Sequence, residues 1–195
     1  ADNTTNTITD SSRLSTEEDY SAAIYSKEDL IINGNGTLNV NAGYRNGIKS
    51  TDDCIIVSGT LNITSTEDGI IGKDLCGVVA GDININAGSD GIKSTYDTDT
   101  TKGNVIIEGG NITIKASNDG IQAENILVIN DGAINIKTNN GAADTTQTHI
   151  DNMDMGRGGF GFNNNKTTTT TDDTSESRKG IKAGNMLIIN DGDIT

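Results

Sequence analysis

The sequence predicts an all-β fold, a right-handed parallel β-helix in which each coil of roughly 22 residues supplies about three short strands. The first observation behind this prediction is a repeated Gly-Ile step, whose glycines are separated by 22, 22, 29 and 60 residues. The last two intervals equal one period plus insertions of 7 and 38 residues. The second observation is the alternation of apolar and polar residues, which is strand periodicity. Right-handed coiling follows the usual rule for parallel crossovers. The recurring glycines are Gly47, Gly69, Gly91, Gly120 and Gly180.

Each coil is expected to hold its strands in the same order. The first strand begins at the Gly-Ile step, the second is an apolar run such as 54–57, and the third follows a Gly-containing turn such as 58–59. The absence of proline suits strands that are paired on both sides. The predicted inward columns are Ile48, Ile70, Ile92 and Ile121; Ile32, Ile56, Val78, Ile107, Ile129 and Ile189; Leu61, Ile83, Ile112, Ile134 and Ile194; and Val40, Ile63, Ile85, Ile114 and Ile136.

The chain divides into a short N-terminal part and the solenoid. Residues 1–21 are expected to form a cap or extension, with a capping-box pattern at 15–18 that predicts a turn of helix or an irregular cap. Residues 22–195 form the β-helix, interrupted by a loop at about 95–102 and by a long Gly-, Asn- and Thr-rich insertion at about 139–178, which we expect to be flexible. The sequence ends inside a third strand, so we expect a further segment to continue the stack.

Charge excludes several classes of partner. The formal net charge of −14 and the pI of about 4.2 argue against nucleic acid and against an anionic membrane surface. No apolar run approaches the length of about 18 residues that a spanning helix needs, and the polar start of the chain favours a secreted or cell-surface protein. Cys54 and Cys76 lie one period apart, and we favour two stacked, buried thiols over a disulfide.

Two acidic columns point to a divalent cation. In the first, carboxylates precede the glycine of successive coils, and in the second they follow it by about five residues. Stacked carboxylates with amide and carbonyl oxygens nearby suit Ca²⁺, which takes six to eight oxygen ligands. The alternative is that Asp-Gly dipeptides simply form turns. The candidate ligands are Glu67, Asp68, Asp90, Asn118 and Asp119 in the first column, and Asp52, Asp53 and Asp74, joined by Glu28 and Asp29, with Asp97 and Asp99 in the nearby loop, in the second.

Two further columns face outward. Lys49, Lys93 and Lys182 follow the glycines by two residues and, with Arg45, could bind sugar carboxylates or could only balance charge. An Asn and Thr column could form hydrogen bonds along the stack or could lie under a glycan; it comprises Asn39, Asn62, Asn84, Thr113 and Asn135. The only histidine, His149, lies in the long insertion, and no catalytic triad, phosphate loop or Cys-His zinc pattern is present.

These motifs resemble a known family. The stretches at 90–94, 118–123 and 188–194 resemble the secreted carbohydrate-binding β-helix proteins of plant-cell-wall-degrading bacteria. The resemblance implies bound Ca²⁺ and binding of cellulose and of polygalacturonate, the backbone of pectin. It extends to the family 9 pectate lyases, in which an Asp-Gly ladder holds Ca²⁺ and a lysine is the base. The position of a third acidic lyase ligand is occupied here by Lys49, Ile71, Lys93 or Gln122.

The sequence therefore leaves three functions open. The leading one is a non-catalytic, calcium-dependent module for acidic cell-wall polysaccharide, in which Ca²⁺ offsets the repulsion between a protein of charge −14 and a polyuronate. The second is a calcium-dependent pectate lyase that acts by β-elimination, with Lys49 or Lys93 as the base. The third is a structural stalk or adhesin at the cell surface.

Overall fold

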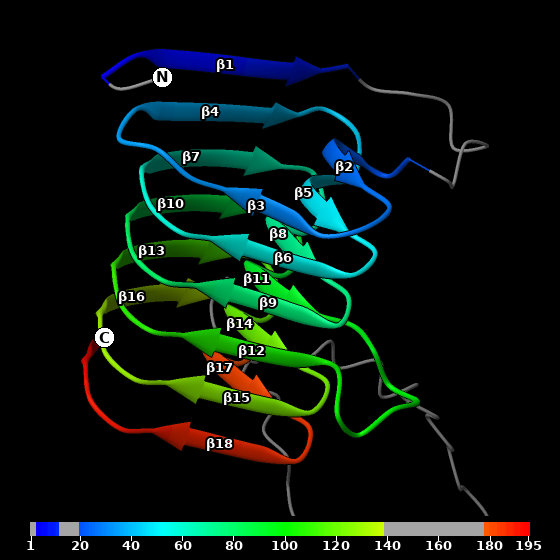
Figure 1. Ribbon diagram of the computed structural model, residues 1–195, viewed down its shortest axis with the longest axis vertical. Coiled ribbons are helices and arrows are strands. Elements are labelled where there is room, and N and C mark those ends of the chain that lie inside the picture. The colour runs from blue at the N-terminus through cyan, green and yellow to red at the C-terminus, as the bar shows by residue number, and fades with distance from the viewer. Residues whose placement is uncertain (1–2, 12–19, 139–177) are drawn as a thin grey trace, which may run out of the picture.

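The chain coils into a parallel β-helix. Its computed structural model describes residues 3–11, 20–138 and 178–195, and these residues form strands and turns without an α-helix. Three parallel sheets run along the stack, and successive strands of the chain visit them in rotation (Figure 1). The predicted all-β solenoid with three strands per coil is thus confirmed. Within the described ranges, no helix is long and apolar enough to cross a membrane.

One sheet has seven strands and the other two have six. In each sheet, strands of successive coils pair in the register of the sequence repeat. Sheet A consists of β1 (Thr5–Asp10), β4 (Thr37–Ala42), β7 (Thr60–Ser65), β10 (Asp82–Ala87), β13 (Asn111–Ala116), β16 (Ala133–Thr138) and β19 (Asp193–Ile194). Sheet B consists of β2 (Ala22–Ser26), β5 (Asn46–Ser50), β8 (Ile70–Gly72), β11 (Ile92–Ser94), β14 (Ile121–Ala123) and β17 (Ile181–Ala183). Sheet C consists of β3 (Leu30–Ile32), β6 (Asp53–Ile56), β9 (Leu75–Val78), β12 (Asn104–Ile107), β15 (Ile126–Ile129) and β18 (Met186–Ile189).

The core is a set of aliphatic columns between the sheets. The isoleucines that follow the first four repeated glycines pair with one another across sheet B, and each is fully buried. Removing this apolar surface from water stabilises the fold by roughly 25 cal/mol per Å². The predicted column of Ile48, Ile70, Ile92 and Ile121 is confirmed.

The repeated glycine is required by close packing between coils. A Cβ atom on Gly69 would lie 2.5 Å from the Gly91 carbonyl oxygen and 2.6 Å from Cγ2 of Ile85. A Cβ atom on Gly91 would meet the Gly120 oxygen and Cγ2 of Ile114, each at 2.5 Å. Backbone atoms cannot yield as a flexible side chain can, so any larger residue would push the coils apart. The Gly-Ile step therefore marks a tight corner of the coil.

The N-terminal part differs from the expectation. Residues 5–10 form β1, which pairs with all of β4 in register and adds a strand to sheet A. The sequence did not predict this strand because its one aliphatic residue, Ile8, gives too little periodicity. The capping-box pattern at 15–18 and the long insertion, apart from its last residue, lie outside the described residues. Residues 95–103 connect β11 to β12.

The two cysteines lie in the core of sheet C. Cys54 and Cys76 are register partners on β6 and β9, and both are free and buried. A hydrogen bond with Cys54, together with burial, raises the pKa of the Cys76 thiol well above its usual value. Thiols held in the neutral form are poor nucleophiles and poor metal ligands. They therefore act as small apolar residues in the core.

Candidate functional site

The first acidic column is a buried ladder that joins successive coils. We call Asp68, Asp90 and Asp119 the Asp-Gly ladder. Oδ1 of Asp68 accepts the Asp90 backbone N–H at 2.9 Å, and Oδ1 of Asp90 accepts the Asp119 N–H at 2.9 Å. Oδ1 of Asp119 accepts the Lys179 N–H at 2.7 Å, and Asn46 plays the same part for the Asp68 N–H at 3.1 Å. Each side chain thus satisfies a backbone donor of the next coil, which the turn would otherwise leave buried.

The remaining carboxylate oxygens of the Asp-Gly ladder face lysines. Nζ of Lys93 lies 2.6 Å from Oδ2 of Asp90 and 3.8 Å from Oδ2 of Asp68. Nζ of Lys182 lies 3.5 Å from Oδ2 of Asp119. Burial lowers the pKa of Lys93, but the two carboxylates outweigh it, and the net pKa is raised. Ionised aspartates in such a stack need a counter-cation, and in this geometry the lysine ammonium groups supply it.

The other candidate ligands of this column, and the other predicted sugar-binding cations, have protein partners of their own. Glu67 faces Arg45, with 3.8 Å between Oε1 and Nε. Nδ2 of Asn118 donates to the hydroxyl of Ser89 at 3.1 Å. Lys49 donates to the Ser21 hydroxyl at 3.1 Å, and burial lowers its pKa despite the nearby Asp68 charge. The four predicted sugar-binding cations, Arg45, Lys49, Lys93 and Lys182, are therefore engaged with protein groups.

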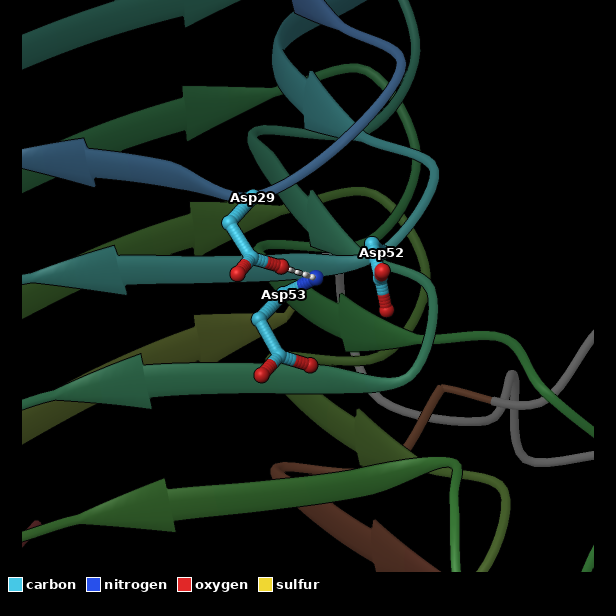
Figure 2. A group of neighbouring side chains, drawn as sticks. All are labelled: Asp29, Asp52 and Asp53. Atoms are coloured by element: carbon cyan, nitrogen blue, oxygen red, sulfur yellow. Dashed lines mark hydrogen bonds between the residues drawn. The ribbon is translucent and has the colours of Figure 1, made fainter.

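The second acidic column gathers three carboxylates at one corner. We call Asp29, Asp52 and Asp53 the acidic cluster. It lies where the chain enters β3 and β6, and Figure 2 shows the three side chains next to one another there. One carboxylate oxygen from each lies within 4.8 Å of the others, and the Asp53 N–H donates to Oδ1 of Asp29 at 3.3 Å. In the part of the chain that the structure describes, no other group of three metal-ligating side chains comes as close together.

The electrostatics of the acidic cluster favour a cation. A hydrogen bond shared with the Asp74 carboxyl, followed by burial and neighbouring charges, raises the pKa of Asp52. Burial and the charges of Asp29 and Asp74 raise the pKa of Asp53. Repulsion between the ionised carboxylates thus contributes to both shifts. The donors are all oxygens, and their spacing fits a hard ion whose ligands at 2.3–2.6 Å can stand about 5 Å apart across it. The residues therefore fit Ca²⁺.

The loop between β11 and β12 closes over Asp74 beside the acidic cluster. Lys102 forms an ion pair with Asp74, and the ammonium groups of Lys73 and Lys102 lie 4.9 and 5.0 Å from the centre of the Tyr96 ring. Oδ1 of Asp99 accepts the N–H and hydroxyl of Thr101, which lowers the Asp99 pKa. The other candidate in this loop, Asp97, is exposed. The sequence analysis missed Lys102 because the residue lies in an insertion, outside the repeat.

The outer face of sheet A carries the predicted amide ladder. Nδ2 of Asn62 donates to Oδ1 of Asn39 at 2.9 Å, and Nδ2 of Asn84 donates to Oδ1 of Asn62 at 3.1 Å. These bonds confirm that the amides pair along the stack. The column continues through Thr113 and Asn135, on β13 and β16.

The outer face of sheet C is apolar, which the sequence analysis did not predict. One outward row crosses all six strands, and Ile31 at its end is 63% exposed. The signal was present as apolar runs, such as 54–57, that are longer than alternation alone requires. The row consists of Ile31, Ile55, Gly77, Ile106, Val128 and Ile188.

Comparison with known proteins assigns a family. The whole chain, residues 1–195, matches the model of a family described as "Carbohydrate-binding domain-containing protein". A curated protein with the same description, from Acetivibrio thermocellus, is 37% identical over 67 residues, which make up 32% of this chain and 23% of that protein. A solved structure described as the polysaccharide lyase-like protein from C. thermocellum, in a gadolinium derivative, is similar over 97% of this chain with a TM-score of 0.73 and 26% identity.

The relatives are longer than this chain. The match covers 64% of the solved lyase-like protein and less than a quarter of the curated one. The chain therefore shares the β-helix architecture of the solved structure and the family description of the curated protein.

Proposed function

Because the chain belongs to the family of carbohydrate-binding domain-containing proteins, we propose that it is a calcium-dependent, non-catalytic module for acidic plant cell-wall polysaccharide. Its ligands are polygalacturonate and pectin, and cellulose in addition. It acts outside the bacterial cell, in secreted form or at the surface. The other candidate role, a structural stalk or adhesin, gains nothing from the family match.

The observation that carries this proposal is the acidic cluster. Asp29, Asp52 and Asp53 present oxygens within 4.8 Å of one another, and two of these carboxyls have a raised pKa. Ca²⁺ held there would relieve their mutual repulsion and would keep coordination positions for sugar carboxylates. A bridging cation is what a protein of charge −14 needs in order to hold a polyanion.

The Asp-Gly ladder has a structural role in this proposal. Asp68, Asp90 and Asp119 have their oxygens committed to backbone N–H groups and lysines, so they hold the coils in register. Ca²⁺ would have to displace a lysine ammonium group to enter this column. We therefore assign the metal to the acidic cluster, where Asp74 stands beside it.

A lyase is the second candidate, favoured by the solved lyase-like relative. The two lysines considered as bases differ in their suitability. Asp68 and Asp90 raise the pKa of Lys93, which keeps it protonated, whereas burial lowers the pKa of Lys49. Lys49 is thus the better base if elimination occurs. We expect none, because the position of the third acidic ligand of the lyases is not acidic in any coil.

The test is a pull-down on insoluble polygalacturonate and on cellulose, in Ca²⁺ and in chelator. We expect Ca²⁺ to strengthen retention on polygalacturonate and the pair Asp52→Asn and Asp53→Asn to remove that gain. The matched control is Asp131→Asn with Asp191→Asn, two exposed acids in turns far from the acidic cluster. Equal retention with and without Ca²⁺ would overturn calcium dependence. Growth of the unsaturated-uronate absorbance that Lys49→Met abolishes would establish the lyase instead.

A further inference from the structure

Two lysines lie side by side on the outer face of sheet A. Lys115 on β13 and Lys137 on β16 are register partners, and both are exposed. Adjacent strands stand about 4.8 Å apart, so the two side chains start from neighbouring positions on one face. Asn86 on β10 continues the row on the other side of Lys115. The row therefore presents two cations and an amide together.

These two lysines have no acidic partner, in contrast to the lysines that face aspartates. Lys93, Lys102 and Lys182 form ion pairs with aspartates. Across residues 3–11, 20–138 and 178–195, the side chains of Lys115 and Lys137 form no ion pair and no hydrogen bond. In a chain with 28 acidic and 14 basic residues, an adjacent pair of uncompensated lysines is unusual. Like charges opposite each other destabilise a sheet, so the pair calls for an anion.

The lysines border a hollow at the carboxyl ends of the strands. The hollow has a volume of about 340 Å³, and its polar lining includes Asn86, Ser117 and Thr138. Ala87 and Ala116 also line the hollow. Hydroxyl and amide groups next to ammonium groups suit a sugar acid, which offers hydroxyls and a carboxylate on one ring.

We propose that Lys115 and Lys137 form a metal-independent subsite for the carboxylates of an acidic polysaccharide. The subsite lies on sheet A, apart from the acidic cluster where the chain enters β3 and β6. The proposal rests on the proposed function only for the class of ligand, an acidic glycan. It replaces Lys49, Lys93 and Lys182, which are engaged with protein groups, as the site of carboxylate recognition.

The negative net charge does not prevent such a contact. At 0.1 M ionic strength the Debye length is about 10 Å, so most of the protein's acidic groups are screened from a ligand at this face. The nearest residues on the face, Thr113 and Asn135, are uncharged. A carboxylate in contact with the two ammonium groups is attracted at short range, where screening is weak. Binding should therefore persist at moderate salt and fall at high salt.

The experiment measures binding of the complete chain to soluble polygalacturonate in chelator at 0.1 M NaCl. The test variant is Lys115→Gln with Lys137→Gln, and Lys115→Arg with Lys137→Arg keeps the charge. The matched control is Lys27→Gln with Lys73→Gln, which removes two exposed lysines elsewhere. We expect the Gln pair to lose about tenfold in affinity, since it removes two charge-assisted contacts, and the other two variants to bind nearly as the wild type does.

Three further arms separate the outcomes. Fully methyl-esterified pectin should bind no better to the wild type than to the Gln pair, because it lacks carboxylates, and 0.5 M NaCl should abolish the difference on polygalacturonate. Wild-type affinity of the Gln pair in chelator, or absence of any binding by the wild type in chelator, would overturn the subsite. A failure of the proposed calcium dependence would give a different result. Ca²⁺ would not change the binding of the wild type, while the Lys115→Gln and Lys137→Gln pair would still lose affinity.

Discussion

The two acidic columns use the same residue type in the same repeat, yet they have different surroundings. In the Asp-Gly ladder, Asp90 is 4% exposed, one of its oxygens accepts a backbone N–H, and the other faces Lys93. In the acidic cluster, Asp52 and Asp53 lie nearer to solvent, and both pKa values are raised, that of Asp52 mainly by a hydrogen bond with the Asp74 carboxyl and that of Asp53 by burial and neighbouring charges. The difference shows that repetition of an acid does not define its role. What each oxygen contacts decides whether the column holds the fold or can accept a ligand.

The cause lies in where each column meets the coil. The Asp-Gly ladder precedes a corner at which a Cβ on Gly91 would touch the next coil, and its buried carboxylates must be paired. The acidic cluster stands at the start of β3 and β6, where Asp29 is exposed and Asp52 and Asp53 are partly exposed (Figure 2). Enclosure favours lysine partners from the chain itself, and exposure leaves room for an ion from solution.

The largest expected effect is the loss of a ladder carboxylate. Asp90→Ala should lower the free energy of unfolding by about 3 kcal/mol, because it strands the Asp119 N–H and takes from Lys93 its nearer partner. Urea denaturation measures this loss, which should be equal in Ca²⁺ and in chelator.

The matched variant Asp90→Asn keeps the acceptor oxygen and loses only the ion pair, so it should cost clearly less. If Asp90→Ala destabilised the protein only when Ca²⁺ was present, the ladder would be a metal site and the comparison between the columns would fail.

The second effect concerns calcium and stability. Ca²⁺ at a hundredfold excess over its Kd should add about 2.7 kcal/mol if it binds only the folded state. The pair Asp52→Asn and Asp53→Asn should abolish this gain, whereas Asp90→Asn should retain it. Thermal unfolding with and without chelator checks both expectations, and a gain that survives in the cluster variant would place the ion elsewhere.

The fold was predictable to a greater extent than the site. The period of the Gly-Ile step identified the column of Ile48, Ile70, Ile92 and Ile121, because a core residue must recur in every coil. Strand β1 could not be predicted, since its pairing with β4 depends on backbone hydrogen bonds that any sequence of hydroxyl and amide residues can make. Periodicity predicts the residues that recur in every coil, but it does not predict a feature that occurs in only one coil.

Sequence spacing likewise did not predict which side chains pair with the residues of the site. The repeat identified Asp68, Asp90 and Asp119 as a column, but it did not show that Lys93 folds back onto two of them. Lys102 reaches Asp74 from an insertion that has no counterpart in other coils. Partner choice for a long side chain depends on rotamers and on neighbouring turns, which sequence spacing does not encode.

The third effect is a dependence on pH. Because Asp52 and Asp53 have raised pKa values, the folded protein binds more protons there than the unfolded chain does, and this contribution to stability grows as pH falls from neutral through those values. Without Ca²⁺, the wild type should therefore gain stability relative to Asp52→Asn with Asp53→Asn on acidification. Ca²⁺ needs the ionised carboxyls, so its stabilising effect should vanish over the same range. Melting temperatures between pH 7 and pH 4 test both signs, and a calcium effect that is flat with pH would contradict them.

The smallest expected effect comes from the lysine that stands closest to the acidic cluster. Lys102 pairs with Asp74, and its charge opposes the raised pKa of Asp53. Lys102→Met should leave Asp74 without its cation and make the corner more negative, so the Ca²⁺ affinity should rise by up to about fivefold, the scale of one unit charge a few ångströms away in water. Lys102→Arg keeps the charge and serves as the control in a calorimetric titration with Ca²⁺. The effect should shrink as salt is raised, because the charge is partly exposed. If Lys102→Met weakened Ca²⁺ binding, the loop that closes over Asp74 would be part of the metal site, and the acidic cluster would depend on enclosure as the Asp-Gly ladder does.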